Sequence, residues 1–492
     1  MAAPQIRNHI RFLLNGEEIA LSDVRPDETL LDYLRLRQRL VGTKEGCAEG
    51  DCGACTVLVG RLAADGLVYE TVNSCIRFLG SVEGCHVVTI EHLRGEGGGL
   101  HPVQQALVDL HGSQCGFCTP GFVMSLYALW MRNPRPDDRA IEKALQGNLC
   151  RCTGYEPIVK AARAVAANGR LEADFLVRER AAVTGRLKAM RDGRRVEIGS
   201  GKDRLVIPAD LDDLGRVYEA EPGARIVAGS TDVGLWVTKF MRDIAPVVFV
   251  GALDELRRIA VHGDRIGIGA GVSYSEAFAT LAARIPALGA LIDRIGGEQV
   301  RNMGTIGGNI ANGSPIGDTP PPLIALGATL TLRKGRGRRT IPLEDFFVAY
   351  GKQDRAPGEF VETVEVPLPA AGAHFAAYKV TKRRDEDITA TLGAFHVVVR
   401  DGRVASARIA YGGMAATPKR ARAVEAAIEG RPWTLATVEE ALPAYDTDFQ
   451  PISDMRASAE YRMLAAKNLL KRFYLETTGT KAPVQVRRYE EA

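Results

Sequence analysis

Hydrophobic and polar positions alternate in the first part of the chain, as they do in strands whose side chains point to opposite faces of a sheet. This pattern predicts strands at His9–Leu14, Thr56–Val59, Leu67–Val72 and His86–Ile90. Leucines with helical spacing predict one helix between the first two strands, at Thr29–Leu40. We therefore expect residues 1–94 to form a β-rich domain.

The periodicity becomes helical after the glycine run at 95–99, which we interpret as a flexible joint. Apolar stripes predict helices at Pro102–Leu110, Phe122–Met131, Ala140–Leu145 and Pro157–Ala167. Residues 95–168 are therefore expected to form a four-helix domain. Residues 169–196, rich in Arg, Ala and Glu, are interpreted as a connector that is partly helical.

Strand and helix patterns alternate over the rest of the chain. Strands predicted at Arg225–Ala228, Pro246–Val250, Arg265–Gly269 and Thr329–Leu332 indicate an α+β domain at 197–371. A further domain at 372–480 has predicted strands and helices at Phe375–Val380, Gly393–Val399, Ala405–Tyr411, Lys419–Ile428 and Ser458–Tyr474. Residues 481–492 form a tail, and the predicted fold class is multidomain α+β.

Composition and charge exclude several classes of protein. The 492 residues are 46% hydrophobic and 25% charged, which is typical of globular domains. A formal net charge of +3 gives no reason to expect a nucleic-acid partner. No stretch approaches the roughly 18 apolar residues of a membrane span, and the N-terminal residues lack the pattern of a secretion signal. We therefore expect a cytoplasmic protein that binds neither nucleic acid nor membranes.

Eight of the nine cysteines lie in two groups before residue 153. A disulfide framework is poorly suited to a chain that is expected in the cytoplasm, where grouped thiols more often bind metal. The ninth cysteine, Cys85, stands at the start of a predicted strand and is interpreted as a small core residue.

The first group has the spacing C-x4-C-x2-C at Cys47, Cys52 and Cys55, with nineteen residues between Cys55 and Cys75. This is the spacing of plant-type ferredoxins with a 2Fe–2S cluster. Glycines beside these cysteines let the backbone fold closely around inorganic sulfides. A structural zinc site is the alternative, but zinc sites commonly use two C-x2–4-C pairs, and Cys75 stands alone.

The second group combines a C-x2-C pair, Cys115 and Cys118, with a C-x-C pair, Cys150 and Cys152. In a helical domain both pairs can lie at helix N-termini, where free N–H groups favour an anionic cluster. Spacing alone also permits a zinc site or a thiol redox pair.

Three segments resemble the molybdenum hydroxylase family: GCAEGDCGACTV at 46–57, QCGFCTPG at 114–121 and GNLCRCTGY at 147–155. In that family a β-grasp plant-type ferredoxin domain and a four-helix domain each bind one 2Fe–2S cluster. The resemblance implies one cluster on Cys47, Cys52, Cys55 and Cys75, and a second on Cys115, Cys118, Cys150 and Cys152.

Three later segments resemble the flavin part of the same family: RIVAGSTDV at 225–233, RNMGTIGGNIANGSPIGD at 301–318 and YKVTKRRDEDI at 378–388. On its own, a glycine-rich segment is commonly only a turn, although its N–H groups can bind a pyrophosphate. The resemblance implies an FAD-binding domain, a C-terminal flavoprotein domain and an FAD site formed by Ile226, Val227, Ala228, Gly229, Ser230, Thr231, Asp232, Val233, Ile295, Gly304, Thr305, Gly307, Gly308, Asn309, Asp318, Val361 and Lys379.

The fusion of these domains resembles the small subunits of the xanthine dehydrogenase branch of that family. The resemblance implies that electrons come from molybdopterin-bound molybdenum on a large partner subunit, which oxidises hypoxanthine and xanthine to urate. They would pass through the two clusters to FAD and then to NAD+, in a heterotetramer of two small and two large subunits. No residue of this chain is then expected to hydroxylate the substrate.

Two other functions stay open. The chain could be the iron–sulfur and flavin subunit of another molybdenum hydroxylase, which oxidises aldehydes or N-heterocycles and uses oxygen or a quinone as acceptor. It could also be a non-enzymatic electron carrier or assembly module with zinc on its cysteines, in which case the protein would be colourless.

Overall fold

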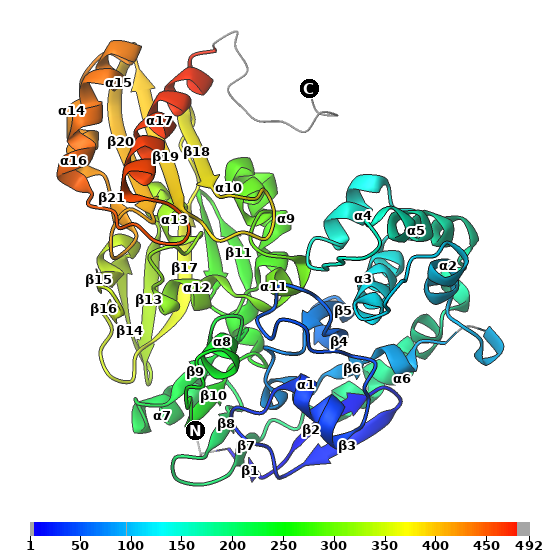
Figure 1. Ribbon diagram of the computed structural model, residues 1–492. Helices are drawn as coiled ribbons and strands as arrows, with labels where there is room; N and C mark the ends of the chain where they lie inside the picture. Colours follow the sequence, from blue (N-terminus) through cyan, green and yellow to red (C-terminus); the bar gives the residue numbers. More distant parts are fainter. Residues whose placement is uncertain (1–3, 95, 480–492) are drawn as a thin grey trace.

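The computed structural model describes residues 4–94 and 96–479, which form four units in chain order (Figure 1). The first unit lies beside the helical second unit, and the third unit joins both to the C-terminal fourth. Helices and sheets are mixed throughout, so the predicted multidomain α+β class is confirmed.

The first unit is a five-stranded sheet of order β3-β2-β6-β4-β5. Its strands are β2 (Ile10–Leu14), β3 (Glu17–Leu21), β4 (Thr56–Ala63), β5 (Gly66–Asn73) and β6 (His86–Val88). The β2–β6 pair is parallel and the other pairs are antiparallel. The predicted helix is shorter than expected: α1 (Leu30–Asp32), capped by the Thr29 side chain, continues as a π-helical turn at Tyr33–Arg37.

The second unit contains the four predicted helices, α2 (Pro102–Asp109), α3 (Thr119–Arg132), α4 (Asp138–Ala144) and α5 (Glu156–Asn168). Helix α3 is central, and its residues 121–130 are all buried. The connector contains a sixteen-residue helix, α6 (Phe175–Met190). Leu187 of α6 belongs to the same apolar core as Leu58 of the first sheet, so α6 packs the first two units together.

The third unit holds two sheets. The first has the order β1-β7-β8-β10-β9 and carries helices α7 (Leu211–Ala220) and α8 (Val233–Thr238). Its strands are β1 (Ile6–Arg7), β7 (Arg195–Ile198), β8 (Leu205–Ile207), β9 (Arg225–Val227) and β10 (Val247–Phe249). Strand β1 comes from the segment that we assigned to the first domain, yet it pairs with β7 in parallel.

The second sheet of this unit has the order β11-β12-β17-β13-β14. Its strands are β11 (Ile259–His262), β12 (Arg265–Gly269), β13 (Thr329–Lys334), β14 (Gly337–Pro342) and β17 (Phe360–Pro367), and β15 (Phe347–Ala349) pairs separately with β16 (Lys352–Gln353). The associated helices are α9 (Tyr274–Arg284), α10 (Pro286–Ile292), α11 (Glu298–Met303), α12 (Ile306–Asn312) and α13 (Pro320–Leu326).

The fourth unit is a sheet of order β18-β19-β20-β21, with strands β18 (Ala373–Val380), β19 (Thr391–Arg400), β20 (Arg403–Gly412) and β21 (Lys419–Arg420). Helices α14 (Arg422–Ile428), α15 (Leu435–Ala441), α16 (Tyr445–Asp448) and α17 (Ala459–Thr477) share a core with it. The other face packs on α13 through Leu392, Ala394 and Ala410.

The predicted helix at Lys419–Ile428 begins three residues late, because Lys419 and Arg420 pair with β20. Arg420 forms an ion pair with Glu425 of the helix at 2.6 Å, which fastens the strand to α14. The predicted tail at 481–492 lies outside the described residues.

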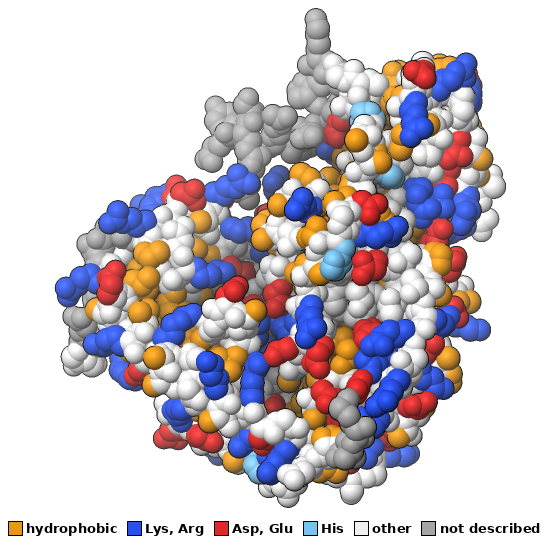
Figure 2. All heavy atoms as spheres, turned by 180° about the vertical axis from the view of Figure 1, so that it is seen from behind, with side chains coloured by type: hydrophobic (Ala, Val, Ile, Leu, Met, Phe, Trp, Pro, Cys, Tyr) orange, Lys and Arg blue, Asp and Glu red, His pale blue; other side chains and the backbone are white. Residues whose placement is uncertain are grey.

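Positive and negative side chains are interspersed on the face shown in Figure 2, in keeping with the small net charge. Within the described part of the chain, no helix combines the length and hydropathy needed to cross a bilayer.

The first two units meet through backbone. A Cβ placed on Gly121 of α3 would lie 2.1 Å from the carbonyl oxygen of Gly53, and one on Gly53 would lie 2.1 Å from that of Gly147. Both distances are far below any van der Waals contact, so these positions accept only glycine while the two backbones stay this close. Gly53 also has φ +68°, in the left-handed region.

We predict that Gly121→Ala lowers the melting temperature, although alanine favours a helix over glycine by about 1 kcal/mol. Overpacking of this contact costs about 1–3 kcal/mol. The matched control is Gly185→Ala in α6, which is exposed and has no described atom within 4 Å of its Cβ position. It should leave the melting temperature unchanged or raise it. Equal behaviour of the two variants in thermal unfolding would contradict the prediction.

Candidate functional site

The first cysteine group lies on one loop and on the segment after β5. Cys55 and Cys75 are buried with their sulfurs 3.3 Å apart. Cys47 Sγ accepts from the backbone N–H groups of Glu49 and Cys52, at 3.5 and 3.4 Å. The left-handed backbone at Ala48, Gly50 and Gly53 curls the loop so that these groups point inward.

The thiols of this group cannot all ionise by themselves. The pKa of Cys47 is lowered by hydrogen bonds from the Cys52 and Cys75 thiols. The pKa values of Cys52 and Cys75 are raised because each donates to a neighbouring sulfur and is removed from water. A bound cation would reverse this, because thiolates are the metal-binding form. The donor set therefore suits a metal centre.

The second cysteine group faces solvent. Cys115 and Cys152 are exposed with their sulfurs 3.5 Å apart, while Cys118 and Cys150 are partly buried. Cys118 precedes the first residue of α3, and the turn at Cys150 is held because its N–H donates to Tyr155 Oη at 2.9 Å. Burial, and then the Cys150 sulfur, raise the pKa of Cys118 to about 12.

In both groups the four sulfurs lie together: Cys47 contacts Cys52 and Cys75, and Cys75 contacts Cys55, while Cys115 contacts Cys152 and Cys118 contacts Cys150. Among the described residues, no three His, Cys, Asp or Glu side chains are arranged to hold a single metal ion. Two pairs of thiolates are the donor set of a two-iron cluster with four cysteine ligands. Each group of four could therefore hold such a cluster.

Gln299 of α11 joins the two cysteine units to the third unit. Its side chain is 1% exposed, and its Nε2 donates toward Thr56 Oγ1, Asn148 Oδ1 and Gly147 O at 3.2, 3.1 and 3.4 Å. Thr56 follows the ligand candidate Cys55, and Asn148 lies two residues before Cys150. Nothing in the local sequence pattern distinguished Gln299, because its contacts are all long-range.

The two glycine-rich segments of the third unit are in close backbone contact, at Gly229 and Met303. A Cβ on Gly229 would lie 1.6 Å from Met303 O, and one on Gly307 would lie 2.4 Å from the Cβ of Ala270. These two glycines are thus required by protein packing, a reason that the sequence interpretation did not contain. Thr305 caps α12 by accepting from Gly308 N–H at 3.0 Å, whereas Asp232 makes no capping bond to α8.

Asp318 and Lys379 form an ion pair between the third and fourth units. Lys379 Nζ lies 2.7 Å from Asp318 Oδ2, and its side chain is 3% exposed. Thr389 Oγ1 donates to the other carboxylate oxygen at 2.5 Å, and Lys379 also donates to the carbonyl of Arg294 at 3.2 Å. Ile295, next in sequence to Arg294, is therefore near this pair.

The segment at 304–309 is connected to the same pair, since Asn309 Oδ1 accepts from Thr319 Oγ1 at 2.5 Å. The structure thus brings Ile295, Asp318, Lys379 and both glycine-rich segments into one region. Val361 lies on β17 in the apolar core that also contains Ile295. Thr389 and the Arg294 carbonyl were missed from the sequence; Thr389 directly follows the segment at 378–388.

A loop of the fourth unit reaches the first cysteine group. Burial, and then the nearby Asp51 carboxylate, raise the pKa of Glu386 to about 8. Burial also raises the pKa of Asp51, between Gly50 and Cys52, to about 6. A Cβ on Gly297 would lie 2.6 Å from Glu386 Oε1, so this carboxyl group sits at the junction of the units.

Four family models match successive parts of the chain. They are described as a 2Fe-2S iron-sulfur cluster binding domain at residues 12–76, a 2Fe-2S binding domain at 89–163, an FAD binding domain in molybdopterin dehydrogenase at 199–369 and a CO dehydrogenase flavoprotein C-terminal domain at 376–477.

Similar proteins carry related names. The xanthine dehydrogenase of Emericella nidulans is 33% identical over 523 aligned residues, which cover 94% of this chain and 38% of the relative. The xanthine dehydrogenase/oxidase of Gallus gallus is 31% identical over 549 residues, with 96% and 40% covered. The carbon monoxide dehydrogenase from Hydrogenophaga pseudoflava matches in structure with a TM-score of 0.52 and 29% identity, over 54% of this chain and 93% of that one. The chain spans less than half the length of these curated relatives.

We predict that Gln299→Leu lowers the stability of the assembled units by about 1–3 kcal/mol, because buried polar groups of Thr56, Asn148 and Gly147 lose their shared partner. The matched control is Gln105→Leu on the exposed side of α2, which should cost less than about 0.5 kcal/mol. Urea unfolding midpoints compare the two. A Gln299 variant as stable as the Gln105 variant would show that this junction carries no stability.

Proposed function

The chain belongs to the molybdenum hydroxylase family, and from this membership we propose that it is the iron–sulfur and flavin subunit of a xanthine dehydrogenase. In this proposal it passes electrons from a molybdenum centre on a partner chain to NAD+. The observation that carries the proposal is the presence, on one chain, of two four-cysteine groups joined by Gln299 to a flavin-type domain.

We assign one 2Fe–2S cluster to Cys47, Cys52, Cys55 and Cys75 and the other to Cys115, Cys118, Cys150 and Cys152. FAD is assigned to the region around the Asp318–Lys379 ion pair, with the segments at 226–233 and 304–309, Ile295 and Val361. When bound, the clusters carry single electrons and the flavin carries one or two, which allows delivery as hydride to NAD+.

The chain's own residues hold this region in place. The Lys379 ammonium group is almost fully buried and is neutralised by Asp318, whose second oxygen is held by Thr389. Because the two partners come from the third and fourth units, the ion pair links these units beside the apolar core that they share. A buried pair that loses one partner leaves an uncompensated charge, so both residues are required together.

We propose that the partner chain docks at the second cysteine group. Exposed thiols at Cys115 and Cys152 are bordered by large apolar side chains, with Phe117 46% exposed, Leu149 46% and Tyr155 36%. Apolar and aromatic side chains gathered around a functional group are typical of an interface. The proposed partner carries molybdopterin-bound molybdenum, and the proposed assembly is a heterotetramer of two small and two large subunits.

The names of the curated relatives support xanthine as a substrate of the assembly. We propose hypoxanthine as a further substrate and NAD+ as the acceptor. The purine is assigned to the partner chain, so this chain contributes electron transfer and not hydroxylation. The thiols of the described cysteines are all free, which suits a reducing compartment, and we propose the cytoplasm.

A second candidate is the equivalent subunit of another molybdenum hydroxylase, which oxidises aldehydes or N-heterocycles and reduces oxygen or a quinone. The structural match to a carbon monoxide dehydrogenase, over 54% of this chain, favours this candidate, because that protein is named for a substrate other than xanthine.

We expect the chain, purified anaerobically with any co-purifying partner, to show flavin bleaching and two distinct 2Fe–2S EPR signals on titration with NADH. Cys47→Ala should abolish one EPR signal, because it removes a ligand. Cys85→Ala should leave both, since Cys85 belongs to neither group. A colourless, zinc-containing protein would overturn the clusters. Reduction by dithionite but not by NADH would overturn NAD+ as acceptor and favour the second candidate.

A further inference from the structure

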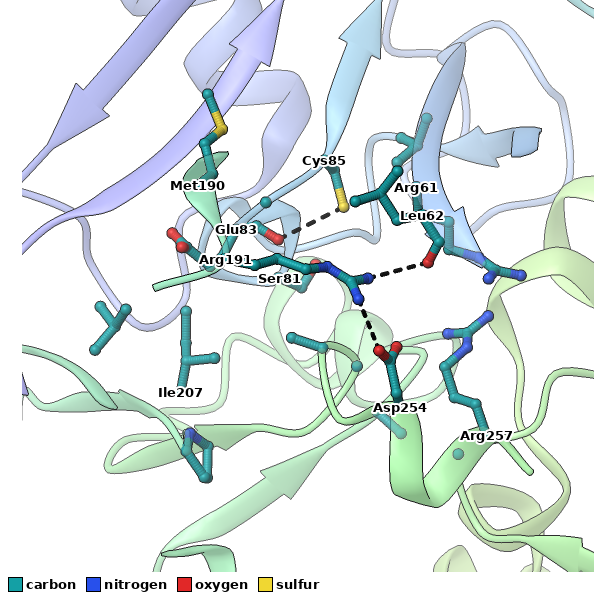
Figure 3. Close-up of a pocket in the computed structure, with 18 of the residues that line it drawn as sticks. Arg61, Leu62, Ser81, Glu83, Cys85, Met190, Arg191, Ile207, Asp254 and Arg257 are labelled. Atoms are coloured by element: carbon teal, nitrogen blue, oxygen red, sulfur yellow. Dashed lines mark hydrogen bonds and ion pairs between the residues drawn. The ribbon is translucent and has the colours of Figure 1, made fainter. Parts of the chain in front are cut away.

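A cavity of about 260 Å³ lies where the first unit, the end of α6 and the third unit meet (Figure 3). Leu62, Ser81 and Cys85 form the wall from the first unit, and Ile207 and Arg257 belong to the wall from the third. The cavity touches the glycine-rich segments at Ala228, Gly229, Ser230, Asn302, Met303 and Thr305. Asp318, Lys379, Ile295 and Val361 do not line it, so the cavity adjoins the proposed flavin region at these two segments without extending to the Asp318–Lys379 ion pair.

Most of the arginines that line this cavity are paired. Figure 3 shows Arg191 reaching Asp254, at 2.7 Å, and the carbonyl of Leu62, at 3.0 Å. Arg61 holds Glu70 with two hydrogen bonds and also reaches Glu276, at 2.8 Å, on which Arg257 converges at 2.8 Å. Arg7 and Glu83 form a further pair at 2.5 Å.

Arg77 is the exception. Its Nη2 donates to the carbonyl of Ser81 at a long 3.3 Å, and its Nε is buried without a partner. Among the described residues, no carboxylate forms an ion pair with it. The charged side chains nearest to it are Glu70, already held by Arg61, and the two cations Arg61 and Arg257. Glu70 and Glu276 are thus used by Arg61 and Arg257. The nearby carboxylates of Glu83 and Asp254 are used by Arg7 and Arg191.

The remaining group beside Arg77 is a neutral thiol. Burial raises the pKa of Cys85, so this thiol supplies no negative charge at neutral pH. A guanidinium group whose buried Nε has no partner, beside a polar cavity, is costly unless an anion or water completes its hydrogen bonds. Planar donors of this kind match oxyanions.

We propose that this cavity binds a small oxyanion, of the class of inorganic phosphate or a short carboxylate, with Arg77 as its main contact. Arg61 and Arg257 add positive potential, and three parts of the chain contribute to the walls. A bound anion would fasten the first unit to the third behind the glycine-rich segments. The inference does not rest on the proposed electron transfer.

The test is a calorimetric titration of the purified holoprotein with sodium phosphate and, separately, with sodium acetate, in a chloride buffer of constant ionic strength. We expect saturable binding of one equivalent in at least one titration, and comparison of the two identifies the source of the oxyanion. Arg77→Met should weaken binding about tenfold or more, because a charge-assisted hydrogen bond is lost. Arg336→Met, at an exposed hairpin turn, is the matched control and should bind as the wild type does.

Absence of saturable binding by either anion, or an Arg77 variant that binds like the wild type, would overturn the proposal. Loss of flavin absorbance in the Arg77 variant would assign the arginine to the flavin instead, and would also overturn it. If the Arg77 variant fails to fold, a measurement on the wild-type protein still tests the proposal.

Iodoacetamide should modify the Cys85 thiol of the wild-type protein more slowly in a solution of the binding anion than in chloride. The rates are read by peptide mass spectrometry, and equal rates contradict the proposal.

Discussion

The rest of the structure depends on the backbone contact at Gly53. This residue ends the turn between two cysteines of the first group, and its carbonyl lies against Gly121 of α3 while its own Cα faces Gly147. Two loops that carry metal-type ligands can approach this closely only where side chains are missing. Because the contact is made of backbone, it has no rotamers and holds the two cysteine groups in one fixed relation.

The third unit is then positioned on that contact. The Gln299 amide group donates to Thr56, Asn148 and Gly147. A single buried side chain of α11 therefore positions both cysteine units relative to the third unit. From α11 the chain leads directly to Thr305 and α12, and through Asn309 to the region of Asp318 and Lys379. These polar and backbone contacts lie beside two large apolar cores, one shared by the first and second units and one shared by the first and third. Together they hold the units in fixed positions.

Charge has a different role at the edges of these contacts. Ion pairs of arginine or lysine with carboxylates cross unit boundaries, as between Arg61 and Glu276 or Lys143 and Asp293. Such pairs, when partly exposed, add little stability individually. Because the hydrogen bonds within these ion pairs are directional, the pairs help to determine which surfaces of the units meet. At the cavity, Arg77 has no carboxylate partner among the residues that the structure describes. This missing partner makes the cavity a candidate site for an anion.

Much of the architecture followed from local patterns. Strand alternation and helical stripes located most elements, and the predicted α+β class is confirmed. The late start of α14, the shortened α1 and the crossing of β1 into the sheet of the third unit were missed. Only the last depends on a distant partner, since Ile6 pairs with β7. Lys419 pairs with the preceding strand β20, and α1 continues directly into the π-helical turn at Tyr33–Arg37.

The sequence by itself determined which residue types stand at which spacing, and hence the two groups of four cysteines, the glycine-rich segments and the order of the units. Ligand spacing and glycine placement are short-range properties that a chain carries in any conformation. Only the tertiary structure decided that the sulfurs of each group meet, that Gln299 joins three units, that Gly229 serves packing and that Arg77 lines a cavity without an ion-pair partner among the described residues. These are meetings of residues tens to hundreds of positions apart, set by the fit of packed surfaces, and no local periodicity encodes them.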